Sequence, residues 1–159
     1  IGEAAFYNCA GLISVTIPGS VTSIGDAAFY FCTGLTGIFF KGDVPTLGTQ
    51  VFSSPSNATV YYLPETLGWA TFDEHERQPL LWNPVIQNDE LFGVKSDRFG
   101  FNITGTANIP FIVEACTNLA ENLWVPLHQQ PITLLNGSYY FSDSNWDNYP
   151  ARYYRINTP

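Results

Sequence analysis

Apolar and polar residues recur with a fixed period of 23 along the first part of the chain. Residues 1–23 return as residues 24–46 with many positions identical, and a third, more divergent copy follows. The shared positions form five columns: Gly2, Gly25 and Gly48; Phe6, Phe29 and Phe52; Leu12, Leu35 and Ala58; Val15, Ile38 and Tyr61; Ile17, Phe40 and Leu63. Such a period indicates an array in which each copy buries its apolar face against its neighbours.

The last three columns have the spacing LxxLxL, which is typical of a short strand. Alternate side chains of an extended segment face opposite ways, so we expect Val15 and Ile17 to point inward and Thr16 outward. The rest of each copy must then form the crossover that parallel pairing requires. The segments AAFYNC and AAFYFC predict one short helical turn in each crossover. The expected fold class is mainly β, with a solenoid of parallel strands and short helical turns.

After Pro84 the period disappears, and a different pattern begins. Apolar residues alternate with polar ones, and turn-forming residues separate the runs, which is typical of antiparallel strands. The expected strands are residues 98–104, 110–116, 123–127, 138–142 and 151–156. We therefore predict two domains, a repeat solenoid with a C-terminal cap over residues 1–84 and a small antiparallel β-sandwich or meander over residues 85–159.

The pattern IGxxAFxxCxxLxxVxIPxxVTxIG of the first two copies resembles the BspA-like class of bacterial leucine-rich repeats, over residues 1 to about 64. This resemblance implies a leucine-rich-repeat solenoid in an extracellular or cell-surface bacterial protein that binds a protein partner, in adhesion or in host or matrix contact. The segment LWNP is similar to the caps of such arrays. Residues 85–159 resemble, in FNITGT, VEACTNL and YFSDSNW, a C-terminal β domain of secreted bacterial repeat proteins, which implies a spacer or an anchoring module.

The net charge narrows the range of partners. Six basic and fourteen acidic residues give a formal charge of -8, which has the wrong sign for binding nucleic acid. Every apolar run is far shorter than the roughly 20 residues that a membrane-spanning helix needs. The chain lacks methionine and opens inside a repeat, so we expect it to be a piece of a longer protein. The uncapped first copy predicts either cover by upstream repeats or self-association.

No residue pattern indicates an enzyme, a cofactor or a metal site. Cys9, Cys32 and Cys116 are too few for a disulfide scaffold, and buried free thiols are favoured over a Cys9–Cys32 bridge. The acidic run around His75 is interpreted as a solvated turn, since adjacent residues do not converge on one metal ion. Asp143, Asn145 and Asp147 follow the first half of a calcium loop, but its second half is missing, which favours an ordinary turn. We expect no catalytic residues.

The outward face of the predicted parallel sheet is the remaining candidate site. Between the inward columns it presents Thr16, Phe39 and Tyr62, with Lys41 at one end. Two neighbouring exposed aromatic rings would favour contact with a partner, so these four residues are the predicted ligand-binding set. A protein ligand is the first hypothesis. A carbohydrate-binding module, in which tryptophan and tyrosine rings stack on a glycan, and an accessory part of a larger secreted enzyme are the alternatives.

Overall fold

The computed structural model describes residues 1–52, 58–72 and 77–159 of the chain. The chain divides into two compact units, Ile1–Trp82 and Asn83–Pro159, which we call the repeat unit and the C-terminal unit. Both are mainly β. Among the described residues, helix is limited to three short 3-10 segments, η1 (Trp69–Thr71), η2 (Leu135–Gly137) and η3 (Trp146–Asn148).

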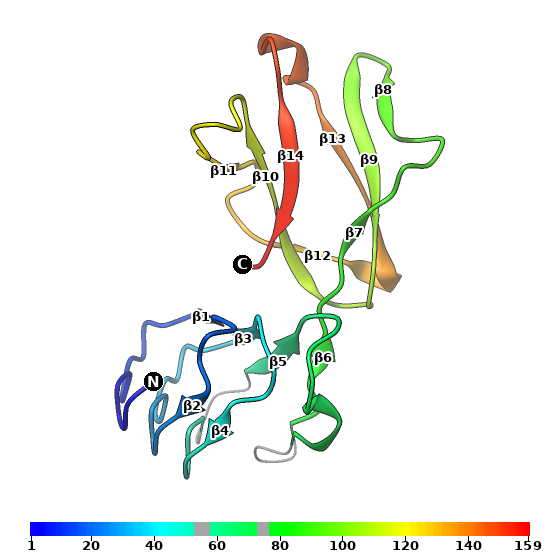
Figure 1. Cartoon of the computed structure of the whole chain (residues 1–159). Coiled ribbons are helices and arrows are strands. Elements are labelled where there is room, and N and C mark those ends of the chain that lie inside the picture. Colours follow the sequence, from blue (N-terminus) through cyan, green and yellow to red (C-terminus); the bar gives the residue numbers. More distant parts are fainter. Residues whose placement is uncertain (53–57, 73–76) are drawn as a thin grey trace. The chain divides into compact units, whose positions relative to one another are not determined.

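The repeat unit contains two parallel sheets (Figure 1). The larger has the order β1-β3-β5-β6, formed by β1 (Ser14–Ile17), β3 (Gly37–Phe40), β5 (Thr59–Tyr62) and β6 (Leu80–Leu81). The smaller pairs β2 (Ser23–Ile24) with β4 (Thr46–Leu47). Equivalent residues of successive copies lie opposite one another, as Val15 and Ile38 do. The parallel strand predicted for each copy is therefore present. Two further short strands, β2 and β4, form a separate sheet of their own.

The segments AAFYNC and AAFYFC form turns and not the predicted helical turn. Ala4 and Asn8 have positive φ angles of 50° and 59°, which a right-handed helix excludes. Their backbone N–H groups donate to the next copy, from Ala4 to Asp26 at 2.9 Å and from Asn8 to Tyr30 at 2.8 Å. Backbone hydrogen bonds therefore link the turns of successive copies, as they link the parallel strands.

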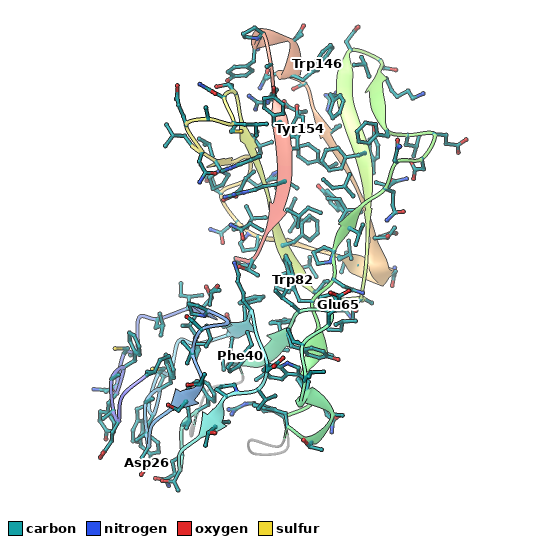
Figure 2. The ribbon with its side chains drawn as sticks, viewed as in Figure 1. Asp26, Phe40, Glu65, Trp82, Trp146 and Tyr154 are labelled. Carbon is teal, nitrogen blue, oxygen red and sulfur yellow. The ribbon has the colours of Figure 1, made fainter. Side chains whose placement is uncertain are left out.

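The core of the repeat unit is organised around a column of stacked phenylalanines. The Phe6 and Phe29 ring centroids lie 4.9 Å apart, and those of Phe29 and Phe52 lie 5.3 Å apart, with nearly parallel planes. This confirms that the Phe6, Phe29 and Phe52 positions are in register. Trp69 packs on Phe40, which Figure 2 labels, with the two ring centroids 4.9 Å apart. The predicted solvated turn around His75 lies outside the described residues.

The backbones of the first and second copies lie very close together at Gly25, a glycine that recurs in each copy. A Cβ at Gly25 would lie 2.6 Å from the backbone nitrogen of Glu3, whereas a Cβ at Gly2 would meet nothing within 4 Å. We expect Gly25→Ala to lower the free energy of unfolding of the repeat unit by about 1 to 3 kcal/mol, because two backbones must separate. Gly2→Ala is the matched control, measured by urea denaturation. Equal effects of the two substitutions would contradict the close approach.

The C-terminal unit contains two four-stranded sheets (Figure 1). In the first, β10 (Pro110–Cys116) pairs antiparallel with β11 (Val125–Pro126), β12 (Ile132–Thr133) and β14 (Tyr153–Asn157). In the second, β9 (Arg98–Thr104) pairs antiparallel with β7 (Val85–Ile86), β8 (Gly93–Lys95) and β13 (Ser138–Asp143). The predicted strands 98–104 and 110–116 are confirmed, whereas β7, β8 and β12 were not expected.

Aromatic side chains join the two sheets of this unit. Tyr154 of β14 stacks on Phe99 of β9 at 5.1 Å and meets Phe101 and Phe141 edge-on at 5.7 and 5.9 Å (Figure 2). Phe101 and Phe141 are buried. Phe101 of β9 and Phe141 of β13 therefore pack against Tyr154 of the other sheet.

Candidate functional site

Three of the four predicted ligand-binding residues, Thr16, Phe39 and Tyr62, lie in one sheet but do not pair with one another in a single row. Thr16 lies opposite Phe39, and Phe39 lies opposite Tyr61. The Phe39 and Tyr61 rings stack at 4.7 Å with an interplanar angle of 10°. Tyr62 is instead the neighbour of Phe40 and stacks on Trp69 at 5.3 Å. The prediction that Phe39 and Tyr62 lie side by side on the outward face is therefore wrong.

The physical reason is a one-residue shortening of the third copy. Phe52 stacks in the column of Phe29, 23 positions earlier, but Val60 pairs with Ile38, 22 positions earlier. One residue fewer therefore separates the phenylalanine from the strand. The signal was present in the sequence, because Val60 continues the column of β-branched residues that Val15 and Ile38 begin. The predicted columns placed Tyr61 and Leu63 of the third copy inward. The structure instead places Val60 beside Ile38 and Tyr62 beside Phe40.

The outward aromatic pair is not an exposed strip. Phe39 is 2% exposed and Tyr61 is 7% exposed. The ring of Phe39 lies over Gly37, where a Cβ would come within 2.9 Å of its Cε2 atom. Burial raises the pKa of the Tyr61 hydroxyl. Lys41, the fourth predicted residue, is exposed and follows β3 directly. The expectation that Phe39 and Tyr62 form an exposed aromatic strip is therefore not met.

A different aromatic cluster of the repeat unit does face solvent. We call Tyr7, Tyr30 and Phe31 the aromatic ridge. The Tyr7 and Tyr30 rings stack at 5.7 Å, and Phe31 meets Tyr30 edge-on at 4.6 Å and Tyr7 at 6.3 Å. Tyr7 is 51% exposed and Phe31 is also exposed. Sequence reasoning missed this ridge, although the signal was a tyrosine that follows the phenylalanine of the stacked column in both full copies.

Phe31 holds a backbone conformation that its residue type disfavours. Its φ angle is 57°, in the left-handed region, and the equivalent residue of the first copy is Asn8 with φ 59°. Asparagine tolerates this region well, whereas a bulky side chain there is strained by roughly 1 to 2 kcal/mol. The second copy therefore keeps an exposed aromatic ring at a position that an asparagine would occupy with less strain.

The first copy differs from the second in burial. Phe6 is 40% exposed, whereas Phe29 is 2% exposed. Cys9 is exposed, which contradicts the expected ladder of buried thiols, whereas Cys32 is buried and its Sγ donates to the backbone oxygen of Phe6 at 3.1 Å. Burial raises the pKa of the Cys32 thiol. Cys9, Cys32 and Cys116 are all free thiols in this structure.

The calcium-like segment of the C-terminal unit is a turn held by side chains. Asp143 is buried, and its Oδ2 atom accepts from Arg152 Nε at 2.6 Å and from the Tyr154 hydroxyl at 3.0 Å. Its Oδ1 atom accepts from the backbone nitrogen of Asn145. Burial, followed by the hydrogen bond to Asp143, raises the pKa of Tyr154. With both oxygens of Asp143 engaged, the turn interpretation accounts for the segment.

The described residues were also compared with the requirements of a metal site and of a membrane span. Within residues 1–52, 58–72 and 77–159, no three His, Cys, Asp or Glu side chains gather in a way that could hold a metal ion. The same part of the chain contains no helix with the length and apolar character needed to cross a bilayer. Trp69 and Trp82 are buried, which removes both from consideration as sugar-stacking rings.

Comparisons with known proteins gave one match. Neither the curated proteins nor the solved structures provided one. Leucine-rich repeats of the matched kind are typically non-catalytic, generally mediate protein interactions, and typically occur in bacterial surface or secreted proteins. Residues 1–74 of this chain, slightly less than half of it, match the family model described as the BspA type leucine-rich repeat region (6 copies).

Proposed function

We propose that this chain is part of a non-enzymatic, secreted or cell-surface interaction protein whose repeat unit binds a protein partner through the aromatic ridge. The observation that carries the proposal is the mutual contact of three rings, of which Tyr7 and Phe31 are exposed and Tyr30 is partly exposed. Tyrosine and tryptophan dominate interface hot spots, and a rigid aromatic ring buries a large area at little entropic cost. The strained Phe31 strengthens the argument, since strain of this kind clusters at functional positions.

The proposed surface replaces the outward sheet face suggested by the sequence. Phe39 and Tyr61, which would have been its centre, are buried. The ridge lies in the turns that precede the strands, and both of its tyrosines follow a phenylalanine of the core column. In the second copy, the buried Phe29 ring therefore fixes the backbone that carries Tyr30 and Phe31. Preorganisation of this kind reduces the entropic cost of binding.

Several finer features belong to the same proposal. The copies form a leucine-rich-repeat solenoid over residues 1–84 with its cap, and residues 85–159 form a β-sandwich that acts as a spacer or an anchoring module. The exposed first copy provides a surface for self-association. The parallel sheets and the family match over residues 1–74 support the first of these statements.

Phe31→Asn tests the proposal by separating binding from folding. Asparagine relieves the left-handed strain of about 1 to 2 kcal/mol, and this gain offsets the loss of aromatic contacts worth about 0.5 to 1.5 kcal/mol each. Because the two terms nearly cancel, we expect the free energy of unfolding to change by less than about 1 kcal/mol. Affinity for a partner captured from extracellular matrix and serum proteins should fall at least about tenfold by surface plasmon resonance, since an aromatic anchor is lost.

Tyr7→Ser should weaken binding in the same way. Leu67→Ser is the matched control, because Leu67 is an exposed apolar residue of the same unit outside the ridge. If Phe31→Asn and Tyr7→Ser bind the captured partner as strongly as the parent does, the ridge is not the binding surface.

A further inference from the structure

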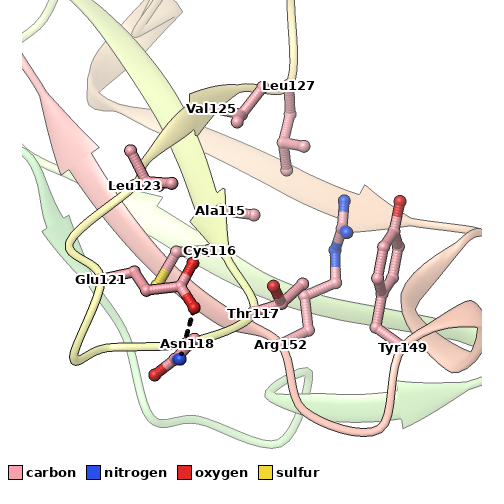
Figure 3. Close-up of a pocket in the computed structure, with 10 residues that line it drawn as sticks. All are labelled: Ala115, Cys116, Thr117, Asn118, Glu121, Leu123, Val125, Leu127, Tyr149 and Arg152. Carbon is pink, nitrogen blue, oxygen red and sulfur yellow. Dashed lines mark hydrogen bonds between the residues drawn. The ribbon is translucent and has the colours of Figure 1, made fainter.

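The C-terminal unit contains a hollow of about 430 Å³. It lies between the segment that follows β10 and the residues that precede β14, and its lining includes Glu121, Leu123, Val125, Leu127, Tyr149 and Arg152 (Figure 3). Its volume falls within the range of about 300 to 1,000 Å³ that small-molecule sites occupy. All of the lining residues belong to this one unit, so the hollow is independent of the aromatic ridge.

A guanidinium group is fixed at one side of the hollow. Arg152 donates from Nε to Asp143 at 2.6 Å, and its Cζ atom lies 4.2 Å from the centroid of the Tyr149 ring. Figure 3 shows the two side chains running alongside each other. The bond to Asp143 engages Nε, and Arg152 also makes a side-chain hydrogen bond with Tyr149, so the remaining N–H groups of the terminal nitrogens can donate to a bound anion. Arginine held in this way matches the planar geometry of a carboxylate.

The opposite charge is also present in the lining. Glu121 accepts from Asn118 Nδ2 at 2.9 Å through Oε1, as the dashed line in Figure 3 marks. Its second oxygen can accept from a ligand N–H or ammonium group. A ligand with two anionic groups would be repelled by Glu121, and a ligand with two cationic groups would be repelled by Arg152.

The third component of the lining is apolar and exposed. Leu123 is 67% exposed and Val125 is also exposed, although both are large apolar residues. Val125 belongs to β11, a two-residue strand paired with β10. A ligand that covers these two side chains together with Leu127 removes apolar surface from water, which favours binding.

We propose that this hollow binds the carboxyl end of a short peptide that terminates in an apolar residue. The terminal carboxylate bonds to Arg152, the apolar side chain packs on Leu123, Val125 and Leu127, and an amino or amide group of the peptide donates to Glu121. This combination of one anion, one donor and one apolar group matches the three parts of the lining. A free apolar amino acid carries the same three groups, and the experiment distinguishes it from a peptide.

Isothermal titration calorimetry on the full chain tests the proposal with three probes: leucyl-leucine, its C-terminal amide, and leucine alone. We expect saturable binding of leucyl-leucine and at least about tenfold weaker binding of the amide, which lacks the charge-assisted bonds to Arg152. Leucine should bind more weakly than the dipeptide, because it covers less of the apolar wall. No saturable heat with leucyl-leucine at millimolar concentration, equal affinities of the acid and the amide, or tighter binding of leucine would each overturn the proposal.

Two substitutions at exposed positions locate the site without disturbing the Arg152–Asp143 pair. Glu121→Gln should weaken leucyl-leucine binding several-fold and should leave the affinity of its N-acetyl form closer to that of the parent. Leu123→Ser should weaken the binding of both forms. Arg98→Gln, which removes an exposed arginine outside the lining, is the control and should bind as the parent does. Unchanged binding in both Glu121→Gln and Leu123→Ser would place the ligand elsewhere and overturn the assignment, as would saturable binding of glucuronic acid with none of the dipeptide.

Discussion

Replacing Phe29 by alanine should lower the free energy of unfolding of the repeat unit by about 3 to 5 kcal/mol. The side chain is almost fully buried between Phe6 at 4.9 Å and Phe52 at 5.3 Å. Its removal leaves a cavity flanked by two rings that backbone hydrogen bonds hold in place, from Phe6 to Ala28 and from Phe29 to Val51. Because the neighbouring rings cannot close the gap without breaking these bonds, the cost should lie in the upper range for a large-to-small change.

Phe6→Ala is the matched control for this prediction. Phe6 stands in the same column but is far more exposed, so its removal should cost less than half as much. Amide hydrogen exchange of β3 reports on the repeat unit alone and measures both variants. Losses of equal size would mean that the column does not carry the stability of the unit.

Replacing Asp143 by alanine should lower the free energy of unfolding of the C-terminal unit by about 3 to 5 kcal/mol, because it leaves a nearly buried arginine without its partner. Asp143 satisfies three donors at once: Arg152 Nε, the Tyr154 hydroxyl and the backbone nitrogen of Asn145. These donors connect β13, the turn and the start of β14. The substitution should therefore increase hydrogen exchange in both strands.

Asp147→Ala is the control, since Asp147 is exposed in the same segment. It should leave the free energy of unfolding within about 0.5 kcal/mol of the parent value. Calcium or a chelator should not change the melting temperature of any of the three proteins. A calcium-dependent melting temperature in the parent that Asp147→Ala abolishes would restore the calcium-loop interpretation and would contradict the structural one.

The sequence predicted the elements with the clearest periods. The copies at a spacing of 23 predicted the parallel strands β1 and β3 and the stacking of Phe6, Phe29 and Phe52. Strict alternation predicted β9 and β10 with the correct bounds. It failed for β7, β8 and β12, which are two or three residues long and carry no period of their own. Such strands exist because a longer neighbour offers them hydrogen bonds.

At the candidate site, the sequence pattern predicted the wrong neighbour for Phe39. A period of 23 extended into the third copy placed Tyr62 beside Phe39, although the true neighbour is Tyr61. In a strand, a shift of one residue reverses which side chains face outward. The loss of one residue before β5 therefore changed the identity of the outward ring without weakening the strand itself.

From the sequence alone it follows that residues 1–46 repeat, that each copy pairs in parallel with the next, and that the chain after residue 84 follows another pattern. These properties depend on local periodicity, which side chains impose wherever the backbone is extended. The three-dimensional structure was needed to show that Phe39 and Tyr61 are buried, that Tyr7, Tyr30 and Phe31 are in contact, and that Arg152 lies beside Tyr149 at a hollow. Exposure and contact depend on which segments meet across long separations in sequence, and no local pattern encodes that.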